Sequence, residues 1–339
     1  MLPELAIAFV LVGVAAYVVL GGADFGAGFW DLTAGGAERG APLRASVKRG
    51  MSPVWEANHV WLIFVLVMLW TAFPGAFGSI GSTLAIPLFL AALGIVLRGG
   101  AFALKGEAAT IAEARALGAT FALSSVLAPF FLGAAAGAIA AGEVPVGNAE
   151  GDAWGSWTGP LPILVGVLAV ATGAHLAAVF LGADARRAGG PEMVHAFRRR
   201  ALGSGVVAGV LAIAGLAVAN SDAPDLYDGL VSGGGLACVI GSAVAGLVTL
   251  VLEWRERFEL ARYSAAAAVG AIVAGWAFAQ EPYLLPPGLT VEEAAAPDAT
   301  LAALVIAATV GMAILIPALA WLFRLALSGK LAYEEEPRP

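Results

Sequence analysis

Three polar side chains at the start of a long apolar stretch are the first candidates for chemistry in this sequence. Glu56, Asn58 and His59 lie in the segment Pro53-Val54-Trp55-Glu56-Ala57-Asn58-His59-Val60-Trp61. A charged side chain in lipid costs roughly 2.5–3.5 kcal/mol even on lenient scales, so these groups should face protein or an aqueous cavity. A carboxylate between water and the membrane interior can take up protons and pass them inward. A structural interpretation stands beside this one, because an acid in the first turn of a helix also favours the helix dipole.

Three further ionisable residues border or enter apolar stretches. Asp24 follows the first stretch in a glycine-rich run, where it either has a functional role or caps the next segment. Arg98 ends the third stretch and could pair with Asp24 or Glu56, or extend to lipid headgroups. His175 is the most deeply placed ionisable residue, and such a histidine is a functional candidate by default. A hydrogen bond between helices explains His175 equally well.

The sequence does not predict a metal site or a catalytic residue in this chain. Glu56 and His59 form one Glu-x-x-His motif, whereas di-iron carboxylate bundles need two such motifs and two further glutamates. The Walker A loop, the Rossmann glycine motif, the nucleophile elbow and the Cys-x-x-Cys pair are all missing. His195 lies among basic residues and is expected to be solvated, and Cys238 is expected to be a small core residue.

Composition shows which elements must position these side chains. Of 339 residues, 60% are hydrophobic and only 13% are charged, against about 25% charged residues in soluble proteins. A helix needs about 20 apolar residues to cross a bilayer. We predict an all-α, polytopic membrane protein of about nine transmembrane helices. The predicted spans are 4–22, 57–73, 77–97, 116–141, 160–182, 202–219, 231–252, 263–280 and 300–325.

The positions of the basic residues predict the topology. All 18 Lys and Arg residues fall on one side of these nine spans, and cytoplasmic connections are the ones that carry such residues. We therefore expect the N-terminus outside and the C-terminus in the cytoplasm. The basic residues are Arg39, Arg44, Lys48, Arg49, Arg98, Lys105, Arg115, Arg186, Arg187, Arg198, Arg199, Arg200, Arg255, Arg257, Arg262, Arg324, Lys330 and Arg338.

The chain is expected to form a single transmembrane domain over residues 1–330, followed by a short cytoplasmic tail at 331–339. The longest connection, roughly 23–56, is too short to bury a core of its own. The first apolar stretch lacks a basic leading region and a small-residue cleavage site, so we interpret it as a retained span and not as a signal peptide.

Several of these segments resemble subunit II of the cytochrome bd-type quinol oxidases, of the cyanide-insensitive-type branch. The resemblance covers essentially the whole chain, and its most specific parts are Pro53-x-Trp55-Glu56-x-Asn58-x-Val60-Trp61 and a proline-rich outer loop. The matching segments are Gly22-Ala23-Asp24-Phe25-Gly26-Ala27-Gly28, residues 53–63, Leu97-Arg98-Gly99-Gly100-Ala101-Phe102, Ala178-Val179-Phe180-Leu181 and residues 275–287.

The resemblance implies a heterodimer in the prokaryotic cytoplasmic (inner) membrane that reduces O₂ to water with quinol as electron donor. The partner, subunit I, would hold haem b and haem d, while this chain would bind no haem and would not be catalytic alone. It would support the partner and provide a proton path from the cytoplasm. A small accessory subunit, membrane lipids and a bound quinone are further expected contacts, and nucleic acid is not expected.

The family pattern assigns roles to individual residues. Glu56 takes the position of the proton-path carboxylate, Asp24 that of a second acid, and Asn58 and His59 lie beside them. Trp55, Trp61 and Arg98 are supporting residues, and His175 is an additional intramembrane candidate. Two departures concern the acids: Gly21 replaces the first acid of Asp-Gly-Phe-Asp, and Glu56-Ala57-Asn58 replaces Asp-Gly-Asn.

Two other classes of function fit a polytopic helical protein. A secondary transporter would carry polar groups near the bilayer midplane, and His175 is the one clear candidate there. A purely structural membrane subunit differs from the proton-conducting one only in whether Glu56 matters. The ionisable groups cluster at the predicted cytoplasmic ends of the spans, which favours a subunit over a carrier.

Overall fold

The computed structural model is almost entirely helical. It describes residues 1–51, 55–104 and 107–327, and their side chains except at 37, 49, 51, 55–57, 323, 326 and 327. The longer helices are α1 (Leu2–Leu32), α3 (Trp55–Ala72), α5 (Ala85–Leu104), α6 (Ile111–Ala140), α8 (Pro160–Arg187), α9 (Pro191–Asp222), α11 (Gly233–Trp254), α12 (Phe258–Gln280) and α14 (Asp298–Leu327). The shorter elements are α2 (Ala37–Met51), α4 (Pro74–Thr83), α7 (Gly155–Thr158), α10 (Pro224–Leu230), α13 (Val291–Ala294) and the antiparallel strands β1 (Tyr283–Leu285) and β2 (Leu289–Thr290).

The prediction of an all-α polytopic membrane protein is confirmed. Within the described residues, eight helices are each long and apolar enough to cross a membrane. Helices α3 and α4 form a pair bent by 120°, and counting this pair as one span gives nine. The orientation of the termini relative to the two sides of the membrane stays a prediction.

The second and third predicted spans, 57–73 and 77–97, have the wrong boundary. Helix α3 ends at Ala72, and Pro74 begins α4, because proline lacks the N–H that a helix interior needs but suits a first turn. The predicted span 77–97 therefore starts inside α4 and crosses the break at Leu84, while the observed span is α5. The first predicted span, 4–22, is also too short, since α1 continues to Leu32.

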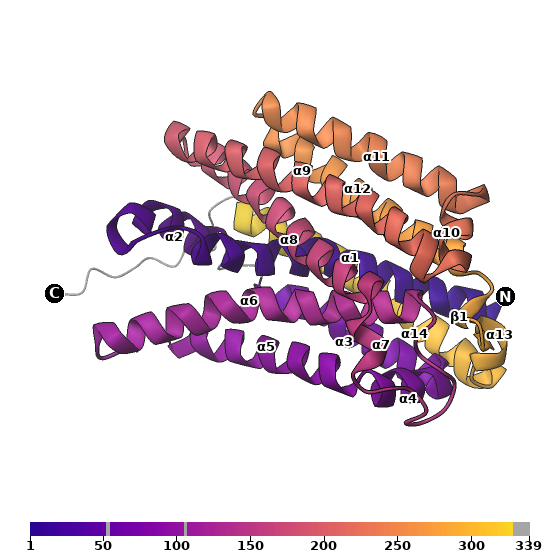
Figure 1. The fold of residues 1–339 in the computed structure, drawn as a ribbon. Helices are drawn as coiled ribbons and strands as arrows, with labels where there is room; N and C mark the ends of the chain where they lie inside the picture. Colours follow the sequence, from indigo (N-terminus) through magenta and orange to yellow (C-terminus); the bar gives the residue numbers. More distant parts are fainter. Residues whose placement is uncertain (52–54, 105–106, 328–339) are drawn as a thin grey trace.

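The long helices run side by side as a bundle, with α8 in contact with α1, α6 and α9 (Figure 1). The short elements α4, α10 and α13 and strand β1 gather at the end of the bundle that holds the N-terminus, whereas α2 lies at the opposite end. Arg44 and Lys48 lie in α2, Arg186 and Arg187 lie in the last turn of α8, and Arg255 and Arg257 follow α11, so we call this opposite end the basic end.

Helices α1 and α8 approach each other closely because glycine lies at their crossing. A Cβ atom added at Gly26 would lie 1.9 Å from the carbonyl oxygen of Gly173, which is far inside contact distance. The contact is reinforced nearby, where the indole nitrogen of Trp30 donates a hydrogen bond of 2.7 Å to the carbonyl of Ala174. Gly26 therefore sets how near the first span comes to the centre of the bundle.

The outer faces of α9 and α11 are aliphatic. The side chains of Ile213 and Leu247 are 70% and 63% exposed in the isolated chain. Continuous apolar surface of this kind is rare on soluble monomers and is expected where lipid or another protein covers the helices. The buried core instead lies around α1, α6 and α8, where the polar side chains described below are also found.

Candidate functional site

A polar cluster near the basic end brings together three of the residues singled out by the sequence: Asp24, Asn58 and Arg98. They come from α1, α3 and α5, and each is at least 92% buried. Asp24 was expected to end the first span, but it lies within α1, which continues for eight more residues. Arg98 likewise lies inside α5, which continues to Leu104. The cluster is thus inside the helical bundle.

Arg98 links three helices through hydrogen bonds. Its Nη2 atom donates to the backbone carbonyl of Asp24 at 3.0 Å, and its Nε atom donates to the hydroxyl of Ser125 on α6 at 3.0 Å. The guanidinium carbon lies 4.9 Å from the ring centre of Phe25 and 5.1 Å from that of Phe121. The reading in which Arg98 extends to lipid headgroups is therefore wrong, because its side chain is only 1% exposed.

Asn58 connects α3 to α1. Its side-chain amide nitrogen donates to the carboxylate of Asp24 and, at 3.3 Å, to the backbone carbonyl of Leu20. The Asp24 carboxylate thus has an amide donor on one side and lies in the same cluster as the Arg98 guanidinium. A buried carboxylate requires compensation of this kind, because removing an unpaired charge from water is costly.

His59 and Trp61 line the same region of α3. The imidazole of His59 packs against the rings of Tyr17 and Phe25, with centroid distances of 6.3 Å and 6.2 Å. Trp61 is buried and meets the ring of Phe64 edge-on at 6.3 Å. His59 therefore lies within reach of the Asp24 cluster, whereas Trp61 serves as a packing residue one turn further along α3.

The backbones of Glu56 and Trp55 form the first turn of α3, next to the cluster. Their side chains lie outside the described part of the structure. The expected proton-path role of Glu56 therefore rests on its sequence position, two residues before Asn58. Its place at the start of α3 confirms that the acid belongs to a first helical turn.

Several polar atoms of the cluster have no hydrogen bond to any residue that the structure describes. They are the Tyr17 hydroxyl, the Asn58 side-chain oxygen and Nη1 of Arg98. Buried polar groups normally find a partner, either in the protein or in ordered water. These atoms are therefore suited to bind ordered water molecules.

Sequence reasoning missed several residues of this region. Ser125 holds Arg98 in place but resembles any small residue of a span. Tyr17 lay inside the predicted span 4–22 and was not singled out, and Trp30 lay in the predicted connection 23–56. Glu253 was missed altogether, although the structure buries it completely next to His175. Its signal in the sequence is a lone acid beside Trp254 at the end of a span, where an exposed interfacial position is the usual expectation.

The structure places His175 apart from the Asp24 cluster. It lies on the side of α8 that faces α9 and α11, where its Nδ1 atom is 3.1 Å from the carbonyl oxygen of Ala201. Its Nε2 atom lies 3.5 Å from a carboxylate oxygen of Glu253. His175 therefore forms contacts between helices, as one of the two sequence interpretations expected, and it also faces an acid that was not expected.

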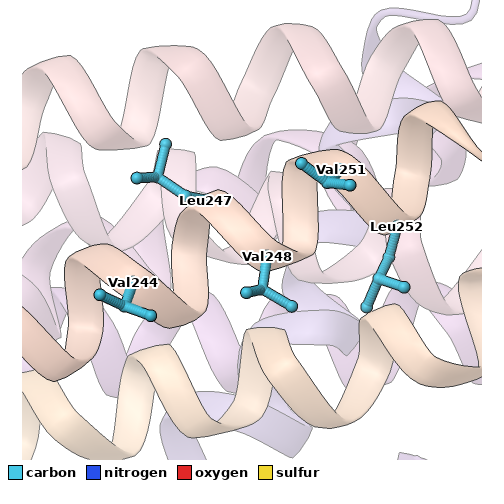
Figure 2. Close-up of a pocket in the computed structure, with 5 residues that line it drawn as sticks. All are labelled: Val244, Leu247, Val248, Val251 and Leu252. Atoms are coloured by element: carbon cyan, nitrogen blue, oxygen red, sulfur yellow. The ribbon is translucent and has the colours of Figure 1, made fainter.

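Within the described residues, no group of three or more His, Cys, Asp and Glu side chains could hold a metal ion. An open groove of about 280 Å³ lies on α11 and is lined only by aliphatic side chains (Figure 2). These side chains are Val244, Leu247, Val248, Val251 and Leu252. The groove offers no polar group for chemistry, so the Asp24 cluster remains the main candidate site.

The fold and the cluster together define a multi-pass helical membrane protein that buries a compensated acid near one end of its spans. Residues 2–326 match the family model described as cytochrome bd terminal oxidase subunit II, and the chain belongs to this family. The family resemblance noted from the sequence is thereby confirmed. Membership also favours the oxidase-subunit interpretation over a secondary transporter.

Individual relatives agree with this assignment. The solved structure of the bd oxidase from Geobacillus thermodenitrificans matches with a TM-score of 0.78 and 25% identity, over 96% of this chain and 98% of that chain. A putative cytochrome bd menaquinol oxidase subunit II of Bacillus subtilis (strain 168) is 35% identical over 86 residues, 25% of this chain and 24% of the relative. The cytochrome bd ubiquinol oxidase subunit 2 of the same organism is 29% identical over 127 residues, 37% of each chain. The aligned parts thus span well under half of these two relatives.

Proposed function

We propose that this chain is subunit II of a cytochrome bd-type quinol oxidase in the cytoplasmic membrane of a prokaryote. The observation that carries the proposal is the match of nearly the whole chain to a bd oxidase structure, at a TM-score of 0.78. In the complex, quinol would donate electrons and O₂ would be reduced to water. This chain alone would not be catalytic.

The haems of the complex, haem b and haem d, belong to the partner subunit I in this proposal and supply the redox chemistry there. The surroundings of two of the three histidines support that division. His175 has one ring nitrogen near the Ala201 carbonyl and the other near Glu253, and His59 is packed between two aromatic rings. A small accessory subunit and a bound quinone or lipid remain predictions from the family resemblance.

The Asp24 cluster provides the proton path of the proposed subunit. Reduction of O₂ to water consumes protons, and the basic end would face the cytoplasm by the positive-inside rule. Glu56, in the first turn of α3, would receive a proton from water and pass it toward Asp24, with Asn58 holding the Asp24 carboxylate in place. Arg98 would keep the cluster neutral overall while the proton moves.

Membership of a haem-bearing complex is tested by purification of the tagged chain from native membranes, followed by reduced-minus-oxidised spectroscopy. The proposal expects a co-purifying partner with the absorption bands of haem b and haem d, and quinol-driven O₂ consumption by the complex. A lone, colourless protein from intact membranes would contradict the proposal and favour a transporter.

The proton role of Glu56 is tested in the complex by replacing Glu56 with Ala or Gln. Quinol-driven O₂ consumption should slow, while the haem spectrum stays mostly intact. Glu107→Gln is the matched control, because this acid is exposed in the connection after α5, at the same end of the bundle. Normal turnover in both Glu56 variants would reduce Glu56 to a structural residue.

A further inference from the structure

A buried acid and a histidine face each other on the side of α8 that does not contact the Asp24 cluster. Glu253, near the end of α11, is completely buried, and its carboxylate lies 3.5 Å from Nε2 of His175 on α8. Neither residue belongs to the path proposed above. Their separation is slightly longer than a hydrogen bond and allows one to form with a small adjustment.

The hydrogen bonding of His175 determines which ring nitrogen carries a hydrogen and which one faces the acid with a free lone pair. Nδ1 lies 3.1 Å from the carbonyl oxygen of Ala201 on α9. A carbonyl oxygen can only accept, so Nδ1 carries a hydrogen in either charge state. Nε2 is then an acceptor in the neutral ring and a donor in the imidazolium. One proton between Nε2 and the Glu253 carboxylate gives a couple that is neutral overall, whichever atom holds the proton.

The surroundings of Glu253 make that proton necessary. Both of its carboxylate oxygens lack a hydrogen bond to any described residue. Within the described part of the chain, His175 is the one ionisable side chain at ion-pair distance from Glu253. An isolated buried carboxylate is costly, so either Glu253 is protonated or His175 is charged. In both cases the couple holds one proton more than a bare carboxylate with a neutral imidazole.

Further polar groups lie on both sides of the couple. Toward the basic end, just after α11, Glu256 contacts His195 at 3.3 Å and Arg198 at 3.2 Å; His195 is exposed, and Glu256 and Arg198 are partly exposed. Toward the membrane interior, one turn from Glu253, the hydroxyl of Thr249 lies 2.8 Å from that of Ser264 on α12. The couple thus lies between a partly exposed acid–histidine pair and a partly buried hydroxyl pair.

The backbone of α9 makes room for this arrangement. A Cβ atom added at Gly205 would lie 2.8 Å from Cε1 of His175 and 2.8 Å from Cδ2 of Leu250. On the other side of α8, Gly173 and Ala174 contact Gly26 and Trp30 of α1, the helix that carries Asp24. The two acid sites therefore lie at a similar level along α8 and on different sides of it.

We propose that His175 and Glu253 form a second proton-binding site, which exchanges its proton with water at the basic end through Glu256 and His195. The exchange breaks an O–H bond of water or hydronium and forms an O–H bond on Glu253 or an N–H bond on His175, and it reverses on release. No electron transfer and no co-reactant are involved. The site is independent of the proposed path through Glu56 and Asp24.

Infrared spectroscopy of the purified complex tests the proposal. The wild type should show either the carbonyl stretch of a protonated Glu253, which shifts in D₂O and is lost in Glu253→Gln, or the imidazolium bands of His175. Glu259→Gln is the matched control, since Glu259 is a partly exposed acid at the start of α12 that contacts Arg187. Its substitution should leave the band unchanged. A band that persists in Glu253→Gln, or is missing in the wild type when His175 also shows no imidazolium bands, would overturn the proposal.

A second variant keeps the test valid if Glu253→Gln does not assemble. In His175→Gln the acid remains but the base that accepts its proton is gone, so deuterium exchange of the carboxylic acid should slow roughly a hundredfold. Exchange at the wild-type rate would show that His175 takes no part. An unchanged haem spectrum in each variant shows that the complex has formed, which separates this result from the outcome of the oxidase tests.

Discussion

Asn58 donates a hydrogen bond from its side-chain amide to the carboxylate of Asp24, and this bond joins α3 to α1 inside the bundle. The two residues are 34 positions apart in the sequence. Arg98 completes the cluster from α5 by bonding the Asp24 carbonyl. The cluster thus ties the first three spans together at the point where the proposed proton path passes.

Arg98 should be required for the stability of the assembled protein. Arg98→Gln removes the charge that compensates Asp24, and loss of one member of a buried pair costs about 3–5 kcal/mol. Arg98→Lys keeps the charge but cannot hold Ser125 and the Asp24 carbonyl together, so a smaller loss of about 1–3 kcal/mol is expected. Thermal unfolding of the purified protein measures both losses. Unfolding of Arg98→Gln at the wild-type temperature would contradict the assignment.

Gly26 should be intolerant of even one added methyl group. In Gly26→Ala the new Cβ atom would lie 1.9 Å from the backbone oxygen of Gly173, so α1 and α8 must move apart, at a cost of about 1–3 kcal/mol or more. Gly22→Ala is the matched control on the same helix, because its Cβ atom would meet Leu176 at an ordinary 3.4 Å. The yield and thermal stability of the two variants should differ clearly, and equal values would argue against the close crossing.

The connection between α6 and α8 should loosen in acid. Backbone N–H groups of Gly155 and Trp154 bond the Asp152 carboxylate and lower its pKa from the ordinary 3.8. Because the carboxylate has a lower pKa in the folded loop than in the unfolded chain, it stabilises the folded loop at pH values above its ordinary pKa. This contribution is lost as the pH falls through the pKa of the folded state. Protease cleavage of the connection should therefore increase as the pH is lowered from about 5 to about 3. Asp152→Asn should lack this dependence, and an equal pH response in both proteins would refute it.

Hydropathy and charge placement predicted the class of fold because they report on each span separately. The helices that cross the membrane and the end that carries the basic residues both follow from local composition. The bend at Phe73 between α3 and α4 did not, because residues 74–83 are apolar enough to pass for the start of a span. Pro74 and the glycine after it mark the break in the sequence. Hydropathy alone does not indicate that the chain changes direction there.

The candidate site was predicted in part. Asp24, Asn58 and Arg98 were named as candidates because they are polar residues near apolar stretches, and the structure brings all three together. The burial of Asp24 and Arg98 was underestimated, since the predicted spans 4–22 and 77–97 ended before these two residues. Ser125 and Glu253 could not be found in this way, because what distinguishes them is the side chain opposite on another helix.

Quinol-driven O₂ consumption by the Asp24→Asn complex tests the central claim most directly, namely that the buried acid of the cluster carries protons. Asn keeps the shape and a hydrogen-bonding oxygen but cannot be deprotonated. The account predicts a rate lower by at least about tenfold with an unchanged haem spectrum, and recovery of most activity in Asp24→Glu. Wild-type turnover in a fully assembled Asp24→Asn complex would contradict it.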